Sequence, residues 1–508
     1  MPEQGTWEDT LTASTASKLA SIVRRLPGIW MARRRAHALA KDLPISTGPT
    51  TLPDLPILES WLQGICRTEH RRPGTPEGRQ AEHWVADRLR EFGLENVTAD
   101  PIPISVWTAD KWSLSIEGRS VPSFYVVNTA FTESQGLTAP LAYVGTGSAG
   151  DFDRADVRGK IVVADVPFPR MPTGLLMKVM RASYMLSDPD RSVSPWSSQY
   201  LNFARQNFIG GATSAETAPA NDVYWQAVRR GACGICLILR DQPTNSNTHY
   251  GPYDGIMKPI PGLWIGKHDG VDLREQARKG ARATLALSGR VEPGTMNNIW
   301  GVLPGRSDEV ILVTSHHDSP FKGAVEDGAG VTQVLAQAWA WSRVPKEQRP
   351  RTLVFVMDAG HFYGSLGGHD FARRHRDLMK KTRILITLEH LGGKEVREQG
   401  RQYVETGRPA LTVMFTSAEP TTIASVIRAL STSPAKHTAS IPSDLIAPVP
   451  TSDASGYVVE AGVPVISWIG CPYYLLDEND TLDKIDRKEL LPICRTVTEL
   501  IRIHMALK

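Results

Sequence analysis

The stretch EVILVTSHHDS, residues 309–319, is an apolar run that ends in two histidines and an aspartate. The helical pattern GVTQVLAQAWAWS (330–342) follows it, and apolar runs then alternate with helical patterns. The later runs are TLVFVMD (352–358), RILITLE (383–389), LTVMFT (411–416) and PVISWI (464–469). This alternation predicts an α/β fold, a mostly parallel sheet with helices on both faces. In such sheets, binding sites form at the carboxyl ends of the strands.

Residue types that bind metal ions gather at these predicted strand ends. The groups are His316-His317-Asp318, Glu326-Asp327 and Glu389-His390. Imidazole and carboxylate groups that converge at one sheet edge suit Zn²⁺ or another divalent ion. A lone histidine at a strand end is more often a hydrogen-bonded structural residue. Several such groups on consecutive strand ends favour a metal site instead.

Length, charge and cysteine content limit the class of protein. A chain of 508 residues is too long for a single core, so we expect two or three domains. Lys and Arg total 57 against 54 Asp and Glu, which gives no reason to expect a nucleic-acid partner. Five cysteines fit a reducing compartment. No run approaches the roughly 18 apolar residues of a membrane span, and the polar start lacks a secretory pattern, so we expect a cytoplasmic protein.

The pattern along the chain predicts two domains and an N-terminal extension. The extension is basic and helical, and we expect Pro27-Gly28 to break its helix and the segment to pack on the protein rather than on a membrane. Short β-type runs between glycine turns predict a small β-rich domain inserted into the α/β domain. The predicted regions are the extension and linker (1–50), the first part of the catalytic domain (51–137), the insertion (138–292) and the main part of the catalytic domain (293–508).

The insertion carries an extra stretch at 168–222 that is rich in proline, serine and aromatic residues. Two interpretations stay open, a surface loop with a small core of its own and an aromatic lid over the site. The aromatic residues are Tyr184, Trp196, Tyr200, Phe203 and Phe208. Cys233 and Cys236 have CxxC spacing, but they lie in an apolar run without a second pair, so we expect buried free thiols.

Several motifs resemble those of the zinc-dependent aminopeptidase family that includes bacterial leucyl aminopeptidase, aminopeptidase Y, glutamate carboxypeptidase II and the transferrin receptor. The 138–292 region is similar to the protease-associated domain found in many members, through LAYVGTGSAGDFDRADVRGKIVVADV and VRRGACGICLIL. The catalytic motifs are SHHDS (315–319), EDGAGV (326–331), ITLEHLGG (386–393), SDASGYVVEAGVPVISW (452–468) and NDTLDKID (479–486). The resemblance implies a zinc-exopeptidase-like fold.

The resemblance also implies which residues hold metal. Family members bind two ions that share an aspartate. Carried over by position, the first ion would be held by His316, Asp327 and Glu389. Phe362 and Leu476 stand where the family has ligands private to the second ion. We therefore expect one divalent ion per chain, with Zn²⁺ favoured and Mn²⁺ or Fe²⁺ as alternatives.

Other residues receive supporting roles. By position His361 replaces the family's catalytic Glu and would act as the base. Asp318 would orient the ring of His316. Asp453 would hydrogen-bond the substrate or His361. We expect the side chains of His317 and His390 to point away from the ligands, as alternation along a strand requires. The residues expected at the substrate or behind the ligands are Asp453, His390, His317 and Glu326.

We expect a single-metal hydrolase that cleaves the amide bond of a small or blocked non-peptide substrate, because replacing the base Glu by His361 weakens binding of a free amine. Three alternatives stay open: an aminopeptidase on short peptides, a non-catalytic binding protein like the transferrin receptor, and acyl transfer or cyclisation as in the related glutaminyl cyclases. The expected partner is a small-molecule or peptide-like substrate, without nucleic acid or a membrane span, and a homodimer is possible.

Overall fold

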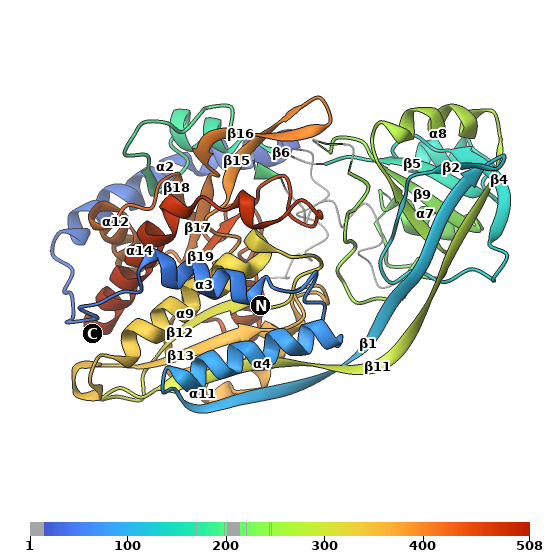
Figure 1. The fold of residues 1–508 in the computed structure, drawn as a ribbon. Helices are drawn as coiled ribbons and strands as arrows, with labels where there is room; N and C mark the ends of the chain where they lie inside the picture. The colour runs from blue at the N-terminus through green and yellow to red at the C-terminus, as the bar shows by residue number, and fades with distance from the viewer. Residues whose placement is uncertain are drawn as a thin grey trace.

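The computed structural model describes residues 15–168, 170–197, 199–200, 214–219, 221–242, 244 and 246–507. Figure 1 shows a large lobe and a small lobe joined by a long two-stranded arm. The arm consists of β1 (Glu95–Ile116) and β11 (Arg282–Leu303), which pair antiparallel over almost their whole length. Each of the two strands therefore runs from one lobe into the other.

The sequence did not predict β1, because Pro101 and Pro103 interrupt the strand pattern. Proline lacks the N–H that a central strand donates to its neighbours. β1 tolerates both prolines because it pairs with β11 along its length and with β2 (Arg119–Val121) only from Leu114 onward. At the two prolines β1 is thus an edge strand.

The sheet of the large lobe is mostly parallel. Its four central strands pair in parallel, as do β17 and β18, whereas β11 pairs antiparallel with β13 and β17 pairs antiparallel with β19. This confirms the predicted α/β fold. In spatial order the strands after β11 are β13 (Thr352–Asp358), β12 (Val310–His316), β14 (Thr382–Glu389), β19 (Val465–Gly470), β17 (Thr412–Thr416) and β18 (Thr438–Pro442).

Helices cover both faces of this sheet, as predicted. Ile311 and Val313 of β12 belong to the core on one face, and Val310 and Leu312 to the core on the other. The first face packs on α3 (Leu55–Ile65), α4 (Pro76–Glu91), α9 (Ala329–Ser342) and α14 (Arg487–Ala506), and the second on α10 (Leu366–Arg374), α11 (Arg376–Lys381) and α13 (Ala454–Ala461).

Shorter elements connect these layers. A hairpin stands apart from the main sheet, and three short helical turns lie in loops. The hairpin is β15 (Lys394–Gln399) and β16 (Gln402–Pro409), and the turns are η2 (Ala324–Gly328), η3 (Lys346–Gln348) and η4 (Leu482–Lys484).

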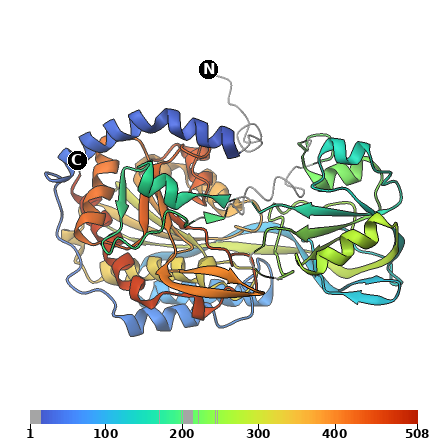
Figure 2. The same cartoon turned by 90° about the horizontal axis from the view of Figure 1, so that it is seen from above.

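The basic N-terminal segment forms one helix, α2 (Thr15–Ala40), which continues through Pro27. The predicted break at Pro27-Gly28 is therefore wrong. Figure 2 shows α2 lying along the large lobe, where it packs on α12 (Pro420–Thr432). Ile22, Leu26 and Ile29 are buried in a core shared with α12, and this packing holds the helix together despite the N–H that proline lacks. Within the described ranges, no helix combines the length and the apolarity needed to cross a bilayer.

The small lobe is built on a mixed sheet, and the β-type runs seen in the sequence are strands there. Cys236 is fully buried within β9, and both it and Cys233 are free thiols. The lobe contains β3 (Phe124–Tyr125), β4 (Leu137–Tyr143), β5 (Ile161–Val166), β9 (Gly234–Leu239) and β10 (Gly262–Ile265), with α5 (Ala149–Asp153), α7 (Val223–Arg229) and α8 (Asp269–Arg278).

Part of the extra stretch at 168–222 packs on the large lobe. β7 (Met185–Ser187) pairs antiparallel with β18, and Tyr184 is buried in the core that α2 and α12 share. Trp196 is 87% exposed. Phe203, Phe208 and the side chain of Tyr200 lie outside the described part of the chain. The remaining elements of the stretch are η1 (Leu175–Val179) and the paired strands β6 (Arg170–Met171) and β8 (Gln199–Tyr200).

The packing of α2 predicts that two neighbouring substitutions differ in their effect on stability. Ile29 is 4% exposed and Met31 is 61% exposed. Ile29→Ala leaves a cavity between α2 and α12 and should lower the free energy of unfolding by about 2–5 kcal/mol. Met31→Ala should change it by less than about 0.5 kcal/mol. Urea denaturation of both variants measures the difference, and equal stabilities would show that α2 does not pack as described.

Candidate functional site

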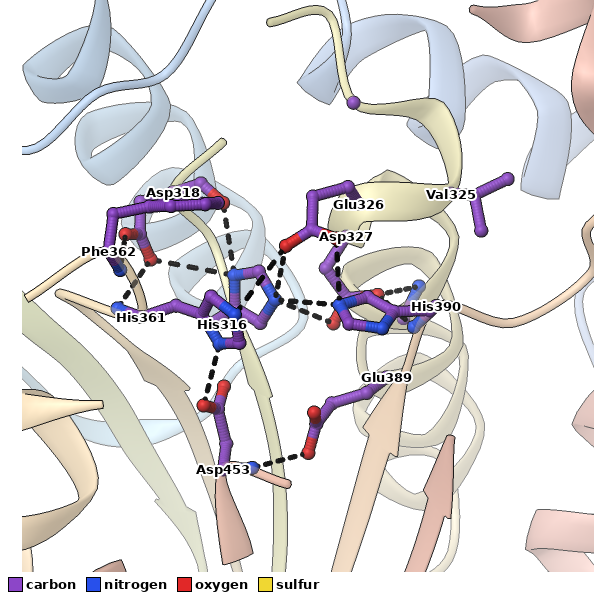
Figure 3. Close-up of polar contacts among 12 residues, drawn as sticks. His316, Asp318, Val325, Glu326, Asp327, His361, Phe362, Glu389, His390 and Asp453 are labelled. Carbon is purple, nitrogen blue, oxygen red and sulfur yellow. Dashed lines mark hydrogen bonds and ion pairs between the residues drawn. The ribbon is translucent and has the colours of Figure 1, made fainter. Parts of the chain in front are cut away.

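A pocket opens at the carboxyl ends of the central strands of the large lobe. His316 and Glu389 are the last residues of β12 and β14, and His361 follows β13. Figure 3 shows these side chains turned toward one another. Tyr253, from the segment between β9 and β10, forms part of the pocket wall. Its ring stacks on that of His361, with 5.4 Å between the ring centroids. The site thus lies where the parallel sheet predicted it.

Four buried side chains meet at the floor of this pocket: His316, Glu326, His361 and His390. One nitrogen or oxygen atom from each lies within 4.8 Å of those of the other three. Glu326 Oε2 is 3.1 Å from His390 Nε2, and Glu326 Oε1 is 3.7 Å from Nε2 of both His316 and His361. The Nε2 atoms of His316 and His390 are 3.5 Å apart. We call these four residues the His₃Glu cluster.

The other ring nitrogen of each histidine contacts an acceptor. Nδ1 of His316 lies 3.0 Å from the carbonyl oxygen of Asp318, and Nδ1 of His390 lies 3.1 Å from that of Gly470. Nδ1 of His361 is 2.8 Å from Oδ1 of Asp453. Carbonyl and carboxylate oxygens accept, so Nδ1 is the donor in all three rings. In the neutral ring the lone pair is then on Nε2, which faces the cluster.

The turn that carries Glu326 is held in place by two buried charged residues that the sequence did not single out. The Asp480 carboxylate accepts hydrogen bonds from the backbone N–H groups of Val325 and Glu326, at 2.9 and 2.8 Å. The Arg71 guanidinium donates to the carbonyls of Gly323 and Glu326, both at 3.2 Å. Asp480 lies in the NDTLDKID motif, and that motif could have indicated that Asp480 belongs to the site. Nothing in the sequence around Arg71 indicated that it holds this turn.

The electrostatics of the cluster favour positive charge. Burial lowers the pKa of His361, but the Asp453 carboxylate and then Glu326 raise it to about 10. Burial also opposes charge on His390, yet Glu326 raises its pKa well above the usual value. For Glu326, burial raises the pKa, but the neighbouring His390, His361 and His316 lower it to about 2. A buried anionic centre of this kind can stabilise a cation.

Only one of the three metal ligands predicted from the sequence belongs to the cluster. His316 belongs to the His₃Glu cluster, but Asp327 and Glu389 do not. The Asp327 carboxylate accepts hydrogen bonds from the Ser315 hydroxyl and from the N–H groups of Gly330 and His390. These bonds make Asp327 a residue that fixes the backbone. Its Oδ2 nevertheless lies 3.9 Å from Nε2 of His316. Oε1 of Glu389 accepts the N–H of Asp453 at 2.8 Å.

The prediction that His390 points away from the ligands is wrong. β14 ends at Glu389, and His390 has a left-handed backbone with φ of 51°, so the alternation of the strand does not extend to it. Its N–H is held by Asp327 and its ring turns into the cluster. His317 does point away, with Nε2 3.0 Å from the carbonyl oxygen of Asn297.

The remaining predicted residues surround the cluster. Asp318 lies 3.5 Å from Nδ1 of His316 and accepts long hydrogen bonds, both 3.4 Å, from the N–H groups of His361 and Phe362. The Asp453 carboxylate accepts a hydrogen bond from the ring of His361, which is one of the two contacts predicted for it. Phe362 and Leu476 are buried and apolar, and neither can bind a metal ion.

Three buried carboxylate oxygens at the site lack a hydrogen-bond partner among the described residues. They are Oε1 of Glu326, Oε2 of Glu389 and Oδ2 of Asp453. A buried carboxylate oxygen without a partner is costly unless a cation or another ligand compensates it. The imidazole and carboxylate donors present are also the types that Zn²⁺ and similar ions prefer. The residues of this chain therefore fit a divalent ion.

Sequence comparison finds that this part of the chain is similar to a known family. Residues 298–501 match the sequence model of Peptidase family M28. The chain is also 25% identical over 328 residues to Aminopeptidase YwaD of Bacillus subtilis. That match covers 63% of this chain and 58% of the relative, so it spans little more than half of the relative's length.

Solved structures share the fold. A zinc aminopeptidase from Bacillus subtilis, BSAP, superposes with a TM-score of 0.64 at 19% identity, covering 89% of this chain and 95% of that chain. A Peptidase M28 precursor from Shewanella amazonensis gives a TM-score of 0.63 at 20% identity, covering 95% and 97%. The strand ends that carry the pocket lie within the range that matches the family. Residues 298–501 of this chain are thus similar to peptidase family M28, and the chain has the fold of the zinc aminopeptidases.

Proposed function

We propose that the protein is a metal-dependent hydrolase that cleaves the amide bond of a small, peptide-like substrate. The observation that carries the proposal is the convergence of three imidazoles and a carboxylate at the floor of a pocket. The similarity to zinc aminopeptidases supports the same reaction class. The five free cysteines agree with a cytoplasmic location, which we propose with it.

A divalent ion bound at such a site polarises the substrate carbonyl and lowers the pKa of water. Glu389 then offers the proton acceptor, because its buried Oε2 has no partner among the described residues and Glu389 lines the pocket. Burial and then the Asp453 carboxylate raise the pKa of Glu389 well above its usual value, and a raised pKa makes a carboxylate a stronger base. The base role expected of His361 thus passes to Glu389 in this proposal. His361 donates from Nδ1 to Asp453 and turns Nε2 toward Glu326, so in this proposal it serves the ion and not the proton transfer.

The pocket supports a substrate with an apolar group beside the amide. Its wall combines Tyr253, Ile469, Leu475 and Leu476 with small polar side chains. His361 faces this space with a positive charge, whether it carries a proton or binds a metal ion. A free ammonium group is repelled by that charge, so we infer a blocked or non-peptide amide. Aminopeptidase activity is the second candidate, favoured by the relatives' descriptions.

Removal of the metal should abolish hydrolysis. Treating the purified protein with a chelator and dialysing it should reduce amide hydrolysis to background, and added Zn²⁺, Mn²⁺ or Fe²⁺ should restore it. His316→Ala should not be restored. If the untreated protein is folded but hydrolyses no amide or ester with any of these ions, the hydrolase proposal fails and a binding protein remains.

Glu389→Gln should lower kcat by about 10²–10⁴, because the amide cannot accept the proton of water. The metal content should stay that of the wild type. Glu91→Gln, on the exposed side of α4, is the matched control and should leave kcat unchanged. Steady-state kinetics with elemental analysis separates the roles, since loss of metal from Glu389→Gln would make Glu389 a ligand.

Substrate blocking is tested with leucine p-nitroanilide and its N-acetyl derivative, in which an acetyl group removes the charge of the terminal amine. We expect kcat/KM to be at least about tenfold higher for the acetylated compound, a difference of about 1.4 kcal/mol. A preference for the free amine would instead support the aminopeptidase alternative.

A further inference from the structure

We infer that this chain binds a single metal ion through the His₃Glu cluster, with His316, His361, His390 and Glu326 as the four ligands. The inference specifies the metal site of the proposed hydrolase and so rests on that function. With four protein ligands, the water or substrate carbonyl of that function would enter as a fifth ligand. It differs from the ligand set expected from the sequence, which shares only His316 with it. In this assignment His361 is a ligand.

The spacing of the donor atoms supports four-coordinate binding. Zinc lies about 2.0–2.2 Å from nitrogen and oxygen ligands in proteins, so the ligand atoms of a tetrahedral site are about 3.3 Å apart. In the cluster Oε2 of Glu326 lies 3.1 Å from Nε2 of His390, and Oε1 lies 3.7 Å from Nε2 of His316 and of His361. The Nε2 atoms of His316 and His390 are 3.5 Å apart. All four ligand atoms lie within 4.8 Å of one another, so shifts of up to about 1.5 Å, with a turn of the stacked His316 and His361 rings, would bring them to the spacing of one shared ion.

The orientation of the histidines supports the same set. All three rings donate from Nδ1 to an oxygen outside the cluster and turn Nε2 inward. This is the arrangement that fixes metal-binding histidines in proteins, because the outer hydrogen bond selects the tautomer and the ring orientation. Histidines with a purely structural role have no reason to aim three Nε2 atoms at one carboxylate.

A second ion has no comparable set of ligands. In the part of the chain that the structure describes, the His₃Glu cluster is the one group of three or more histidine, cysteine or acidic side chains with this geometry. Phe362 packs edge-on against Tyr250 and Tyr253, and Leu476 is buried in the pocket wall. Apolar side chains thus occupy the positions that the family resemblance assigns to a second ion.

Two residues from the sequence prediction distinguish the two ligand sets. Asp327 already accepts from one hydroxyl and two N–H groups. Glu389 keeps one free oxygen, yet it is not part of the cluster. The His₃Glu set therefore requires His361 and His390 for metal binding and does not require Glu389. The set predicted from the sequence requires Glu389 and does not require His361 or His390.

Elemental analysis and cobalt absorption test the inference on the full chain. The protein is stripped with a chelator, loaded with Zn²⁺ or Co²⁺ and dialysed. We expect about one equivalent of either ion per chain, and an intense visible absorption from Co²⁺, as four-coordinate cobalt gives. His361→Gln and His390→Gln should each lower metal affinity by at least about 10–100-fold, since even the loss of an outer hydrogen-bond partner costs that much. Asp453→Asn changes the hydrogen-bond partner of the His361 ring without removing the ring, so it should weaken binding less.

His317→Gln is the matched control, because His317 lies at the same strand end with its ring turned away, and it should bind one equivalent. Glu389→Gln should also retain the ion. Circular dichroism of each variant checks the fold, and Asp453→Asn reports on His361 if His361→Gln does not fold. Two equivalents in the wild type, or metal loss from Glu389→Gln with full binding by His361→Gln, would overturn the ligand set. A loaded protein without turnover would overturn only the proposed hydrolase function.

Discussion

The Glu326 carboxylate, buried among three imidazole rings, is the interaction on which the rest of the site depends. Burying a carboxylate is costly unless opposite charge and hydrogen bonds compensate it. Here the neighbouring turn is fixed by Asp480 and Arg71, and the rings of the cluster supply the positive charge. The structure thus places a negative charge at the pocket floor, and each surrounding histidine turns Nε2 toward it.

The small lobe takes part in the site although it lies beyond the arm. The segment between β9 and β10 returns to the large lobe, where the N–H of Gly364 donates to the carbonyl of Tyr253 at 2.9 Å. This contact places Tyr253 against His361 and Phe362. The inserted region therefore supplies an aromatic wall of the pocket, and the loop that carries His361 is held from both lobes.

Apolar side chains of the pocket stand at the two positions where the family resemblance assigns ligands to a second metal ion. Phe362 and Leu476 are buried where the family resemblance assigns ligands to a second ion. Both side chains lie close to the His₃Glu cluster, and Phe362 contacts the rings of His316 and His361. Apolar surroundings exclude water and strengthen the electrostatic interactions of the remaining charges. These two residues therefore add apolar surface beside the cluster.

The sequence by itself determined the sheet, because buried parallel strands must be apolar and must alternate with helices, and it placed the site at the strand ends. It also identified His316, His361 and Asp453. It could not identify β1, whose prolines are tolerated only because one side is unpaired, or the continuity of α2 through Pro27, which packing maintains. Only the tertiary structure decided the cluster, because the left-handed backbone of His390 and the anchored turn of Glu326 set side-chain directions that strand periodicity does not encode.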